Sequence, residues 1–307
     1  MKSPRFSAWE GVKESLAALA REIAALTGSA CASAPERSIS GGSINTCYYW
    51  SSGLGPMFVK VGPRASHTAF TAEADGLREL QAARALRVPR VLASGVADTA
   101  AFLALEWIER GPSGAACERR LGEGLAALHT VTAPRFGWRR DDTIGRTPQA
   151  NEWSGDWMEF FRERRLRPQL TLGERRGFAH RLIERGARLL EALPALLEGH
   201  RPRASLLHGD LWGGNWLASS AGEPVLFDPA VYYGDREADL AMTRLFGGFG
   251  AAFYRAYESA APLPAGAALR GELYNLYHVL NHANLFGGGY AAQAQSSIER
   301  LLSAVGA

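Results

Sequence analysis

One short polar segment constrains this chain more than any other feature of the sequence. Residues 206–217 read LLHGDLWGGNWL, which places His208, Asp210 and Asn215 close together between apolar residues. Asp228 follows thirteen residues after Asn215, at the end of the apolar run VLF. Amide and carboxylate oxygens are ligands that Mg²⁺ accepts in proteins. The spacing therefore predicts a magnesium site beside an acidic residue on a small loop.

The same spacing is typical of a catalytic loop that transfers phosphate. In protein kinases the loop reads H-R-D-x-x-x-x-N, its Asp accepts the proton of the substrate hydroxyl, and its Asn and a later Asp hold the metal. By this pattern Asp210 is the predicted catalytic base, and Asn215 and Asp228 are the predicted magnesium ligands. His208 has two interpretations: it holds its loop in place, or it contacts the substrate.

A lysine and a glutamate upstream test this interpretation independently. Lys60 lies in MFVKV, which resembles the strand whose lysine pairs the α and β phosphates in kinases. Glu73 follows on a predicted helix, where a carboxylate is expected to anchor the lysine amine. The alternative for the pair is an ion pair on the protein surface, which has little effect on stability.

Two further segments are expected to bind ATP. LALEWIE matches the hinge between kinase lobes, where the backbone of Glu106 and Ile108 is predicted to bind adenine. SISGGSIN lacks the full G-x-G-x-x-G pattern, but its backbone amides can still cradle phosphate. The residues predicted for that turn are Gly41, Gly42 and Ser43.

Hydrophobic periodicity predicts an α+β chain of two lobes, and the kinase-like motifs within it imply a bilobal, protein-kinase-like fold. A smaller β-rich lobe, residues 1–110, is expected to begin with an amphipathic helix that stops at Gly28 and to include a helix over 66–87 that ends at Pro89. A larger, mainly helical lobe is expected over 111–307. Its predicted helices cover the segments 155–166, 173–193, 235–246, 250–259 and 270–304.

Composition indicates an ordinary globular protein. The chain has 307 residues, 47% of them hydrophobic, and a net charge of +3 with dispersed basic residues, so neither nucleic acid nor a membrane is an expected partner. Three cysteines at no metal-ligand spacing, without a signal peptide or a long apolar run, favour a cytoplasmic location. The oligomeric state stays open.

Several other residues allow two interpretations each. Trp212 either binds the acceptor or packs its loop onto the helical lobe. Asp239 is expected to bind the backbone amides of the catalytic loop from below, in preference to a contact with substrate. The arginines in FRERRLRPQL are expected to form a solvated helix face, in preference to binding phosphate or an acidic substrate. The polar and aromatic connection 136–156 is expected to be functional or mobile.

With these motifs in place, the chain resembles the fructosamine kinase, or ketosamine 3-kinase, family. Trp212 and the paired glycines of HGDLWGGN, together with TIGRTPQAN, separate this family from other small-molecule kinases. The resemblance implies ATP- and Mg²⁺-dependent phosphorylation of the 3-hydroxyl of a ketosamine or glycated protein, with Asp210 as base and Lys60 as phosphate anchor. Some relatives carry a redox-sensitive cysteine in the glycine-rich loop; here Ser43 takes that place and Cys47 lies just beyond, which leaves thiol regulation open.

Two other functions remain possible at this stage. One is a different small-molecule kinase of the same fold, of the aminoglycoside or choline type, which would keep the ATP-binding residues and change the acceptor pocket. The other is a nucleotide-binding protein without turnover. The phosphate anchor, base and metal ligands are all present, so no chemical defect in the sequence supports the second.

Overall fold

A five-stranded antiparallel sheet forms the core of the N-terminal part. The computed structural model describes residues 4–39 and 45–307. The strand order is β1-β2-β3-β5-β4. The strands are β1 (Arg37–Ile39), β2 (Thr46–Ser52), β3 (Gly55–Pro63), β4 (Val91–Ala97) and β5 (Ala100–Glu106).

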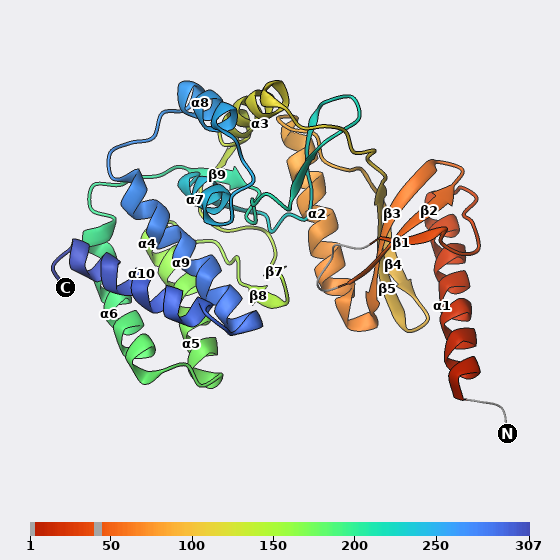
Figure 1. The fold of residues 1–307 in the computed structure, drawn as a ribbon, viewed down its shortest axis with the longest axis horizontal. Coiled ribbons are helices and arrows are strands. Elements are labelled where there is room, and N and C mark those ends of the chain that lie inside the picture. Colours follow the sequence, from red (N-terminus) through yellow and green to blue (C-terminus); the bar gives the residue numbers. More distant parts are fainter. Residues whose placement is uncertain (1–3, 40–44) are drawn as a thin grey trace.

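The two faces of this sheet are covered by different helices. Side chains alternate along a strand, so Phe102 and Ala104 of β5 pack with α1 (Pro4–Thr27), while Leu103 and Leu105 pack with α2 (His67–Ala83). Figure 1 shows α1 on the outer side of the sheet and α2 between the sheet and the rest of the molecule. The helix α2 therefore lies where the two parts of the chain meet.

Both predicted N-terminal helices exist, and one ends earlier than expected. The helix α1 ends at Thr27, and Gly28 follows with φ +66°, as a C-terminal glycine does. The helix α2 ends at Ala83 because Arg84 adopts the left-handed conformation, φ 53°. A local backbone turn ends this helix before Pro89 can.

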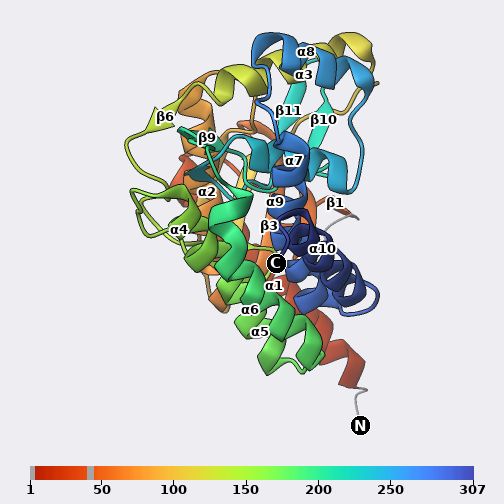
Figure 2. The ribbon, with the colours of Figure 1, turned by 90° about the vertical axis from the view of Figure 1, so that its left-hand side faces the viewer.

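Helices dominate the C-terminal part (Figure 2). One continuous hydrophobic core runs through them and reaches α2 and the inner face of β5. The helices are α3 (Ala115–Leu128), α4 (Trp157–Phe161), α5 (Arg167–Arg175), α6 (His180–Leu196), α7 (Glu237–Leu245), α8 (Ala251–Ala260), α9 (Ala267–Phe286) and α10 (Tyr290–Ala304).

Three small antiparallel sheets lie among these helices. One has the order β12-β9-β6, and the other two are the hairpins β10-β11 and β7-β8. Their strands are β6 (Thr132–Ala133), β7 (Asp142–Ile144), β8 (Thr147–Gln149), β9 (Ala204–Leu207), β10 (Trp216–Ala218), β11 (Pro224–Leu226) and β12 (Tyr232–Gly234).

Two predicted helix boundaries in this part are wrong. The segment 270–304 forms two helices, α9 and α10, because Gly287 and Gly288 adopt positive φ values of 67° and 63° between them. The helix α4 continues through a π-helical turn, Arg162–Leu166, into α5, so the break falls beside Gly177 rather than before residue 173.

The fold is the predicted α+β, bilobal architecture. The β-rich part and the helical part stand beside each other in Figure 1, and α2 faces the helical part. Residue 110 stays a proposed boundary between lobes 1–110 and 111–307. Within the described residues, none of the helices combines the length and apolar character that a membrane crossing requires.

Candidate active site

The small sheets bring the two predicted acidic segments together. The strand β9 ends at Leu207, directly before the catalytic loop, and pairs with β12, which begins four residues after Asp228. The Ala230 amide donates to the His208 carbonyl (2.9 Å), and the Phe227 amide donates to the Asn215 carbonyl (3.1 Å). Residues 208–215 and 227–230 are therefore adjacent loops at one edge of this sheet.

Asp210 and Asn215 form a compact polar unit within the first loop. The Asn215 amide nitrogen donates to the backbone carbonyl of Asp210 (2.8 Å) and to its carboxylate Oδ2 (3.0 Å). Burial raises the pKa of Asp210 to about 7; the Asn215 hydrogen bond opposes this shift, and the charges of Asp228 and Asp239 add to it. A carboxylate with a pKa near neutrality is suited to exchange a proton with a hydroxyl.

Lys60 connects the sheet, α2 and the second acidic loop. Its Nζ lies 2.8 Å from Glu73 Oε1 and 2.7 Å from Asp228 Oδ1. The predicted Lys60–Glu73 contact is therefore confirmed, and it is a buried pair rather than a surface one, since the Lys60 side chain is 7% exposed. Burial alone would lower the pKa of Lys60, but the charges of Asp228 and Glu73 outweigh it and raise that pKa, so the amine stays protonated.

The donor set of this site fits a magnesium ion. The Asn215 amide nitrogen is engaged by its own loop, which leaves the amide oxygen available as a ligand. The Asp228 side chain is 43% exposed, and its Oδ1 contacts Lys60. Asp228 also has φ 55°, a left-handed conformation that Asp tolerates better than most residues and that concentrates at functional sites. These two side chains could hold Mg²⁺ through oxygen atoms.

His208 and Asp239 support the catalytic loop from beneath. His208 has no exposed surface; its Nε2 lies 3.0 Å from the Phe227 carbonyl, and its Nδ1 accepts from the Asp210 amide (3.3 Å). These contacts favour the loop-holding interpretation over substrate contact. Asp239 accepts the backbone amides of His208 (2.8 Å) and Gly209 (2.9 Å), so its predicted role beneath the loop is confirmed.

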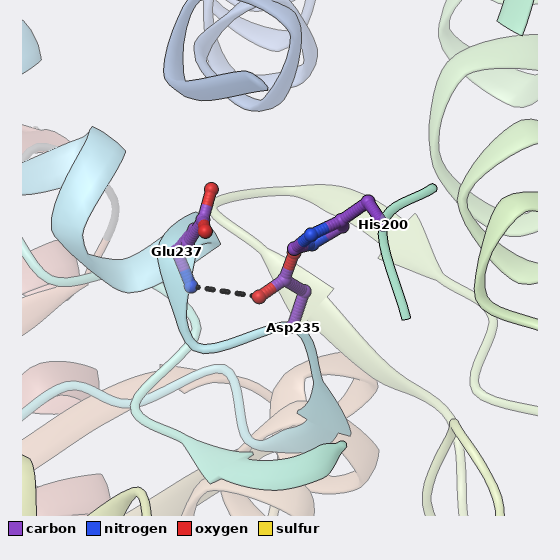
Figure 3. A group of neighbouring side chains, drawn as sticks. All are labelled: His200, Asp235 and Glu237. Atoms are coloured by element: carbon purple, nitrogen blue, oxygen red, sulfur yellow. Dashed lines mark hydrogen bonds and ion pairs between the residues drawn. The ribbon is translucent and has the colours of Figure 1, made fainter. Parts of the chain in front are cut away.

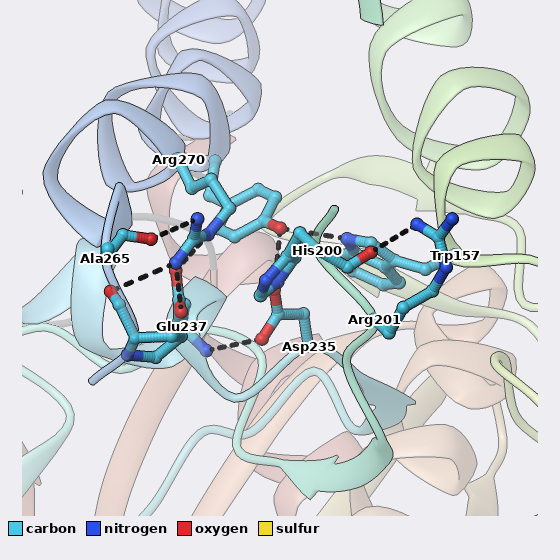
Figure 4. A network of polar contacts seen from close by, with 9 residues as sticks. Trp157, His200, Arg201, Asp235, Glu237, Ala265 and Arg270 are labelled. Carbon is cyan, nitrogen blue, oxygen red and sulfur yellow. Dashed lines mark hydrogen bonds and ion pairs between the residues drawn. The ribbon is translucent and has the colours of Figure 1, made fainter. Parts of the chain in front are cut away.

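A second cluster of acidic residues fixes the start of α7, the helix that carries Asp239. His200 Nε2 lies 2.6 Å from Asp235 Oδ2, which also accepts from the Tyr274 hydroxyl at 2.6 Å. Figure 3 shows Glu237 donating its backbone amide to the other oxygen of Asp235. Arg270 binds both carboxylate oxygens of Glu237 at 2.8 Å within the network of Figure 4. The carboxylate oxygens of Asp235 and Glu237 already have these hydrogen-bond partners, so we interpret the cluster as a structural network rather than a metal centre.

The predicted hinge lies where the sheet ends. Glu106 is the last residue of β5, and its carboxylate binds Arg87 (2.9 Å) and Arg90 (3.4 Å). Its backbone amide donates to the Arg90 carbonyl at 2.9 Å. Because the Glu106 carboxylate is engaged by these two arginines, the Glu106 carbonyl and the amide of Ile108 remain the groups proposed for adenine.

The glycine-rich turn falls outside the described residues, which start again at Asn45. The predictions for Gly41, Gly42 and Ser43 therefore stay predictions. Cys47 is 6% exposed, and burial raises the pKa of its thiol, which lowers the thiolate fraction that oxidation requires. The structure thus disfavours a reactive Cys47.

Close packing around Trp212 explains why glycines follow it in the catalytic loop. Trp212 is 39% exposed, and a Cβ added at Gly214 would lie 2.3 Å from its indole ring. A Cβ at Gly213 would lie 2.8 Å from the backbone of Gly248. Trp212 also meets Phe246, 38% exposed, edge to face with ring centroids 6.2 Å apart. The glycines allow the indole to lie on the loop with an open aromatic face.

One sequence interpretation is wrong at a single residue. Arg165 was expected on a solvated helix face, but it is fully buried; it donates to the Ala150 carbonyl and to Asn151 Oδ1, both at 2.7 Å, and lies 4.1 Å from the Tyr232 ring. A signal was present, because position 165 follows the buried Phe161 by four residues and therefore shares its helix face.

The site combines a lysine held by a helix carboxylate with a base, an amide and a second carboxylate. This combination places the protein in the class of phosphotransferases with a protein-kinase-like fold. An aminoglycoside phosphotransferase, 15% identical, shares this fold with a TM-score of 0.60 over 93% of this chain and 98% of that one. The chain belongs to the fructosamine kinase family, whose model matches residues 15–304.

Two relatives are similar over most of their length. A probable ketoamine kinase from Synechocystis sp. is 45% identical over 92% of this chain and 96% of its own. The chloroplastic protein-ribulosamine 3-kinase of Arabidopsis thaliana is 40% identical over 86% of this chain and 82% of its own. The crystal structure of a "putative fructosamine-3-kinase" from Thermobifida fusca YX-ER1 has a TM-score of 0.83 and 33% identity over 93% of this chain and 98% of that one.

Proposed function

We propose that this chain catalyses the ATP-dependent phosphorylation of the 3-hydroxyl of ketosamines of the fructosamine or ribulosamine type. The observation that carries the proposal is the contact chain from Glu73 through Lys60 to Asp228, beside Asp210 and Asn215, in a member of the fructosamine kinase family. Relatives named ketoamine kinase and protein-ribulosamine 3-kinase support the acceptor class.

Each side chain has a defined task in this reaction. Asp210 orients the acceptor hydroxyl and takes its proton, and Asn215 holds the Asp210 carboxylate in position at 3.0 Å. Lys60 stabilises negative charge on the phosphates of ATP, and Glu73 aims its amine. Asn215 and Asp228 would hold magnesium, which would supply positive charge to the transferring phosphoryl group.

Trp212 is the residue we propose for the acceptor. It lies two positions after Asp210, and its exposed indole offers an apolar face to a sugar ring or to the linked amine. Phe246 extends this aromatic surface. An acceptor bound there lies within reach of the base.

The product explains what the reaction achieves. A phosphate on the third carbon of a ketosamine is lost when the sugar enolises, because negative charge develops next to the carbon that carries the leaving group. The amine is then released after hydrolysis. We therefore propose deglycation of amines as the role of this activity, in the cytoplasm, where the three free cysteines would stay reduced.

A coupled ATPase screen tests the proposed acceptor class. Ribulosamines and fructosamines are compared with aminoglycosides and choline at equal concentration, with Mg²⁺ present. Turnover on the ketosamines supports the proposal. Turnover confined to aminoglycosides or choline would assign another small-molecule kinase, and nucleotide binding without turnover on any acceptor would assign a binding protein.

A further inference from the structure

The connection 136–156 is ordered and attached to the strand that follows Asp228. Gly137 and Tyr233 exchange both backbone hydrogen bonds, at 2.9 and 2.8 Å, and Phe136 and Ser154 do the same at 2.9 and 2.8 Å. Tyr233 belongs to β12, which pairs with β9 at the entrance to the catalytic loop. The connection is therefore tied to the same small sheet that positions Asp210.

The connection and the attached strand β12 also contact α2. Arg140 Nη1 lies 2.6 Å from Asp75 Oδ2, and the Tyr233 hydroxyl donates to Glu79 Oε1 at 2.8 Å. Asp75 and Glu79 are four residues apart, so they lie on one face of the helix. Between them Gly76 packs closely, since an added Cβ would lie 3.1 Å from a methyl group of Val231. Three contacts thus dock one face of α2 onto the helical part.

The docked helix carries the carboxylate that aims Lys60. Glu73 lies two residues before Asp75 on α2, and it holds the Lys60 amine at 2.8 Å. Because α2 carries both Glu73 and the docking contacts, local opening or displacement of an undocked α2 would withdraw Glu73 from Lys60. In kinases this ion pair must be in place for phosphoryl transfer.

We propose that Arg140 and Tyr233 are positioning residues that clamp α2 onto the helical part, so that the Lys60–Glu73 pair is assembled before nucleotide binds. This inference rests on the proposed nucleotide site and adds how that site is held ready. The ion pair is partly exposed, 27% for Arg140 and 20% for Asp75. Asp75 is also contacted by Arg78 at 3.1 Å and, more distantly, by Arg139 of the connection at 3.8 Å. When Arg140 is lost, Asp75 therefore still has a positively charged neighbour. The loss should change the position of α2 more than the stability of the fold.

Arg140→Ala, Tyr233→Phe and the double variant test the clamp. Hydrogen exchange of the α2 amides is measured in the nucleotide-free full chain, followed by the Mg²⁺-ATP dissociation constant. We expect faster exchange in α2 and a dissociation constant raised about 3- to 10-fold in Arg140→Ala, with a larger rise in the double variant. The KM of the acceptor and the thermal midpoint should change little.

Two control variants make the outcome specific. Arg140→Lys keeps the charge and should restore the exchange rate and the affinity. Arg162→Ala removes a comparably exposed arginine that pairs with Glu159 and Glu163 on its own helix, and should change neither. Unchanged α2 exchange in Arg140→Ala would overturn the proposal, and so would weaker ATP binding that follows a general loss of stability. The exchange measurement needs no nucleotide or acceptor, so a failed acceptor screen leaves this test intact.

Discussion

Two acidic clusters lie close together in this sequence and differ in how many partners their carboxylate oxygens already have. In the first, Asp210 is held by one amide and has a raised pKa, while Asp228 contacts Lys60 and stays 43% exposed. In the second, Asp235 and Glu237 are bound by a histidine, a tyrosine and an arginine, and the side chains of Asp235 and Glu237 are each at most 3% exposed. The first cluster keeps capacity for a ligand, and the second has none left.

This difference distinguishes the cluster proposed to take part in the reaction from the cluster that supports the fold. Burying a carboxylate is costly unless it is paired, so a cluster that is left incompletely paired must be held in place by its surroundings. Here the saturated cluster fixes the start of α7, and Asp239 on that helix holds the catalytic loop by two backbone amides. The two clusters should therefore respond to mutation in opposite ways.

The largest effect is expected from Asp210→Asn. The variant keeps the shape of the loop and loses the proton acceptor, so kcat should fall about 10²- to 10⁴-fold while the ATP dissociation constant stays close to that of the wild type. Steady-state kinetics and nucleotide titration measure both quantities. Normal turnover in this variant would show that Asp210 is not the base.

Arg270→Met should act on stability rather than on chemistry. It leaves Glu237 buried without its bidentate partner, which costs about 3–5 kcal/mol of unfolding free energy. Urea denaturation measures the loss, and the ATP affinity of the folded fraction should be kept. Arg300→Ala, which removes an exposed pair with Glu272, is the matched control and should cost about 1 kcal/mol or less. Equal losses in the two variants would contradict a structural role for the second cluster.

Trp212→Ala should show a smaller and selective effect. The indole is 39% exposed, so its removal leaves little cavity, and the thermal midpoint should change slightly. The ketosamine KM should rise about 3- to 10-fold, with the ATP KM unchanged. A loss of about 3–5 kcal/mol in stability, with both constants disturbed, would instead assign Trp212 to loop packing.

The smallest expected effect is a pH-dependent gain in stability from Asp210→Asn. The raised pKa, about 7 against an ordinary 3.8, means that the folded wild type holds this proton more tightly than the unfolded chain does. Wild-type stability therefore declines as pH rises from about 4 to 7, and the Asn variant escapes that decline. Melting curves at pH 5 and pH 8 should show the variant more stable by about 1 kcal/mol or more at pH 8, and by less at pH 5. An equal difference at both pH values would argue against the shifted pKa.

The sequence predicts the parts of the site that depend on short-range spacing. Asp210, Asn215 and Asp228 lie together because their loops flank short strands, and Lys60 reaches Glu73 because a strand and the next helix are adjacent in the chain. The α+β bilobal fold follows from hydrophobic periodicity in the same way. The site residues and the two-lobe fold follow from local sequence patterns, so a single sequence is enough to infer them.

The features that the sequence does not predict depend on long-range contacts. Arg140 meets Asp75 across 65 residues, and no local pattern encodes that pair. The break at Gly287 is an exception, because the three consecutive glycines 287–289 are a local signal for it. The π-helical turn after Phe161 is a small change in backbone geometry that no local pattern marks. The left-handed backbone of Asp228 likewise depends on its neighbours in the folded chain, since Asp adopts this conformation only occasionally.

Phosphorus and proton NMR of the reaction product shows directly which hydroxyl of the ketosamine is phosphorylated. A ribulosamine is incubated with the protein, ATP and Mg²⁺, and the position of the new phosphomonoester is read from its coupling to the sugar protons. We expect a phosphate coupled to the proton on the third carbon, formed by the wild type and absent with Asp210→Asn. A phosphate on another carbon, or equal product from the Asp210→Asn variant, would contradict this expectation.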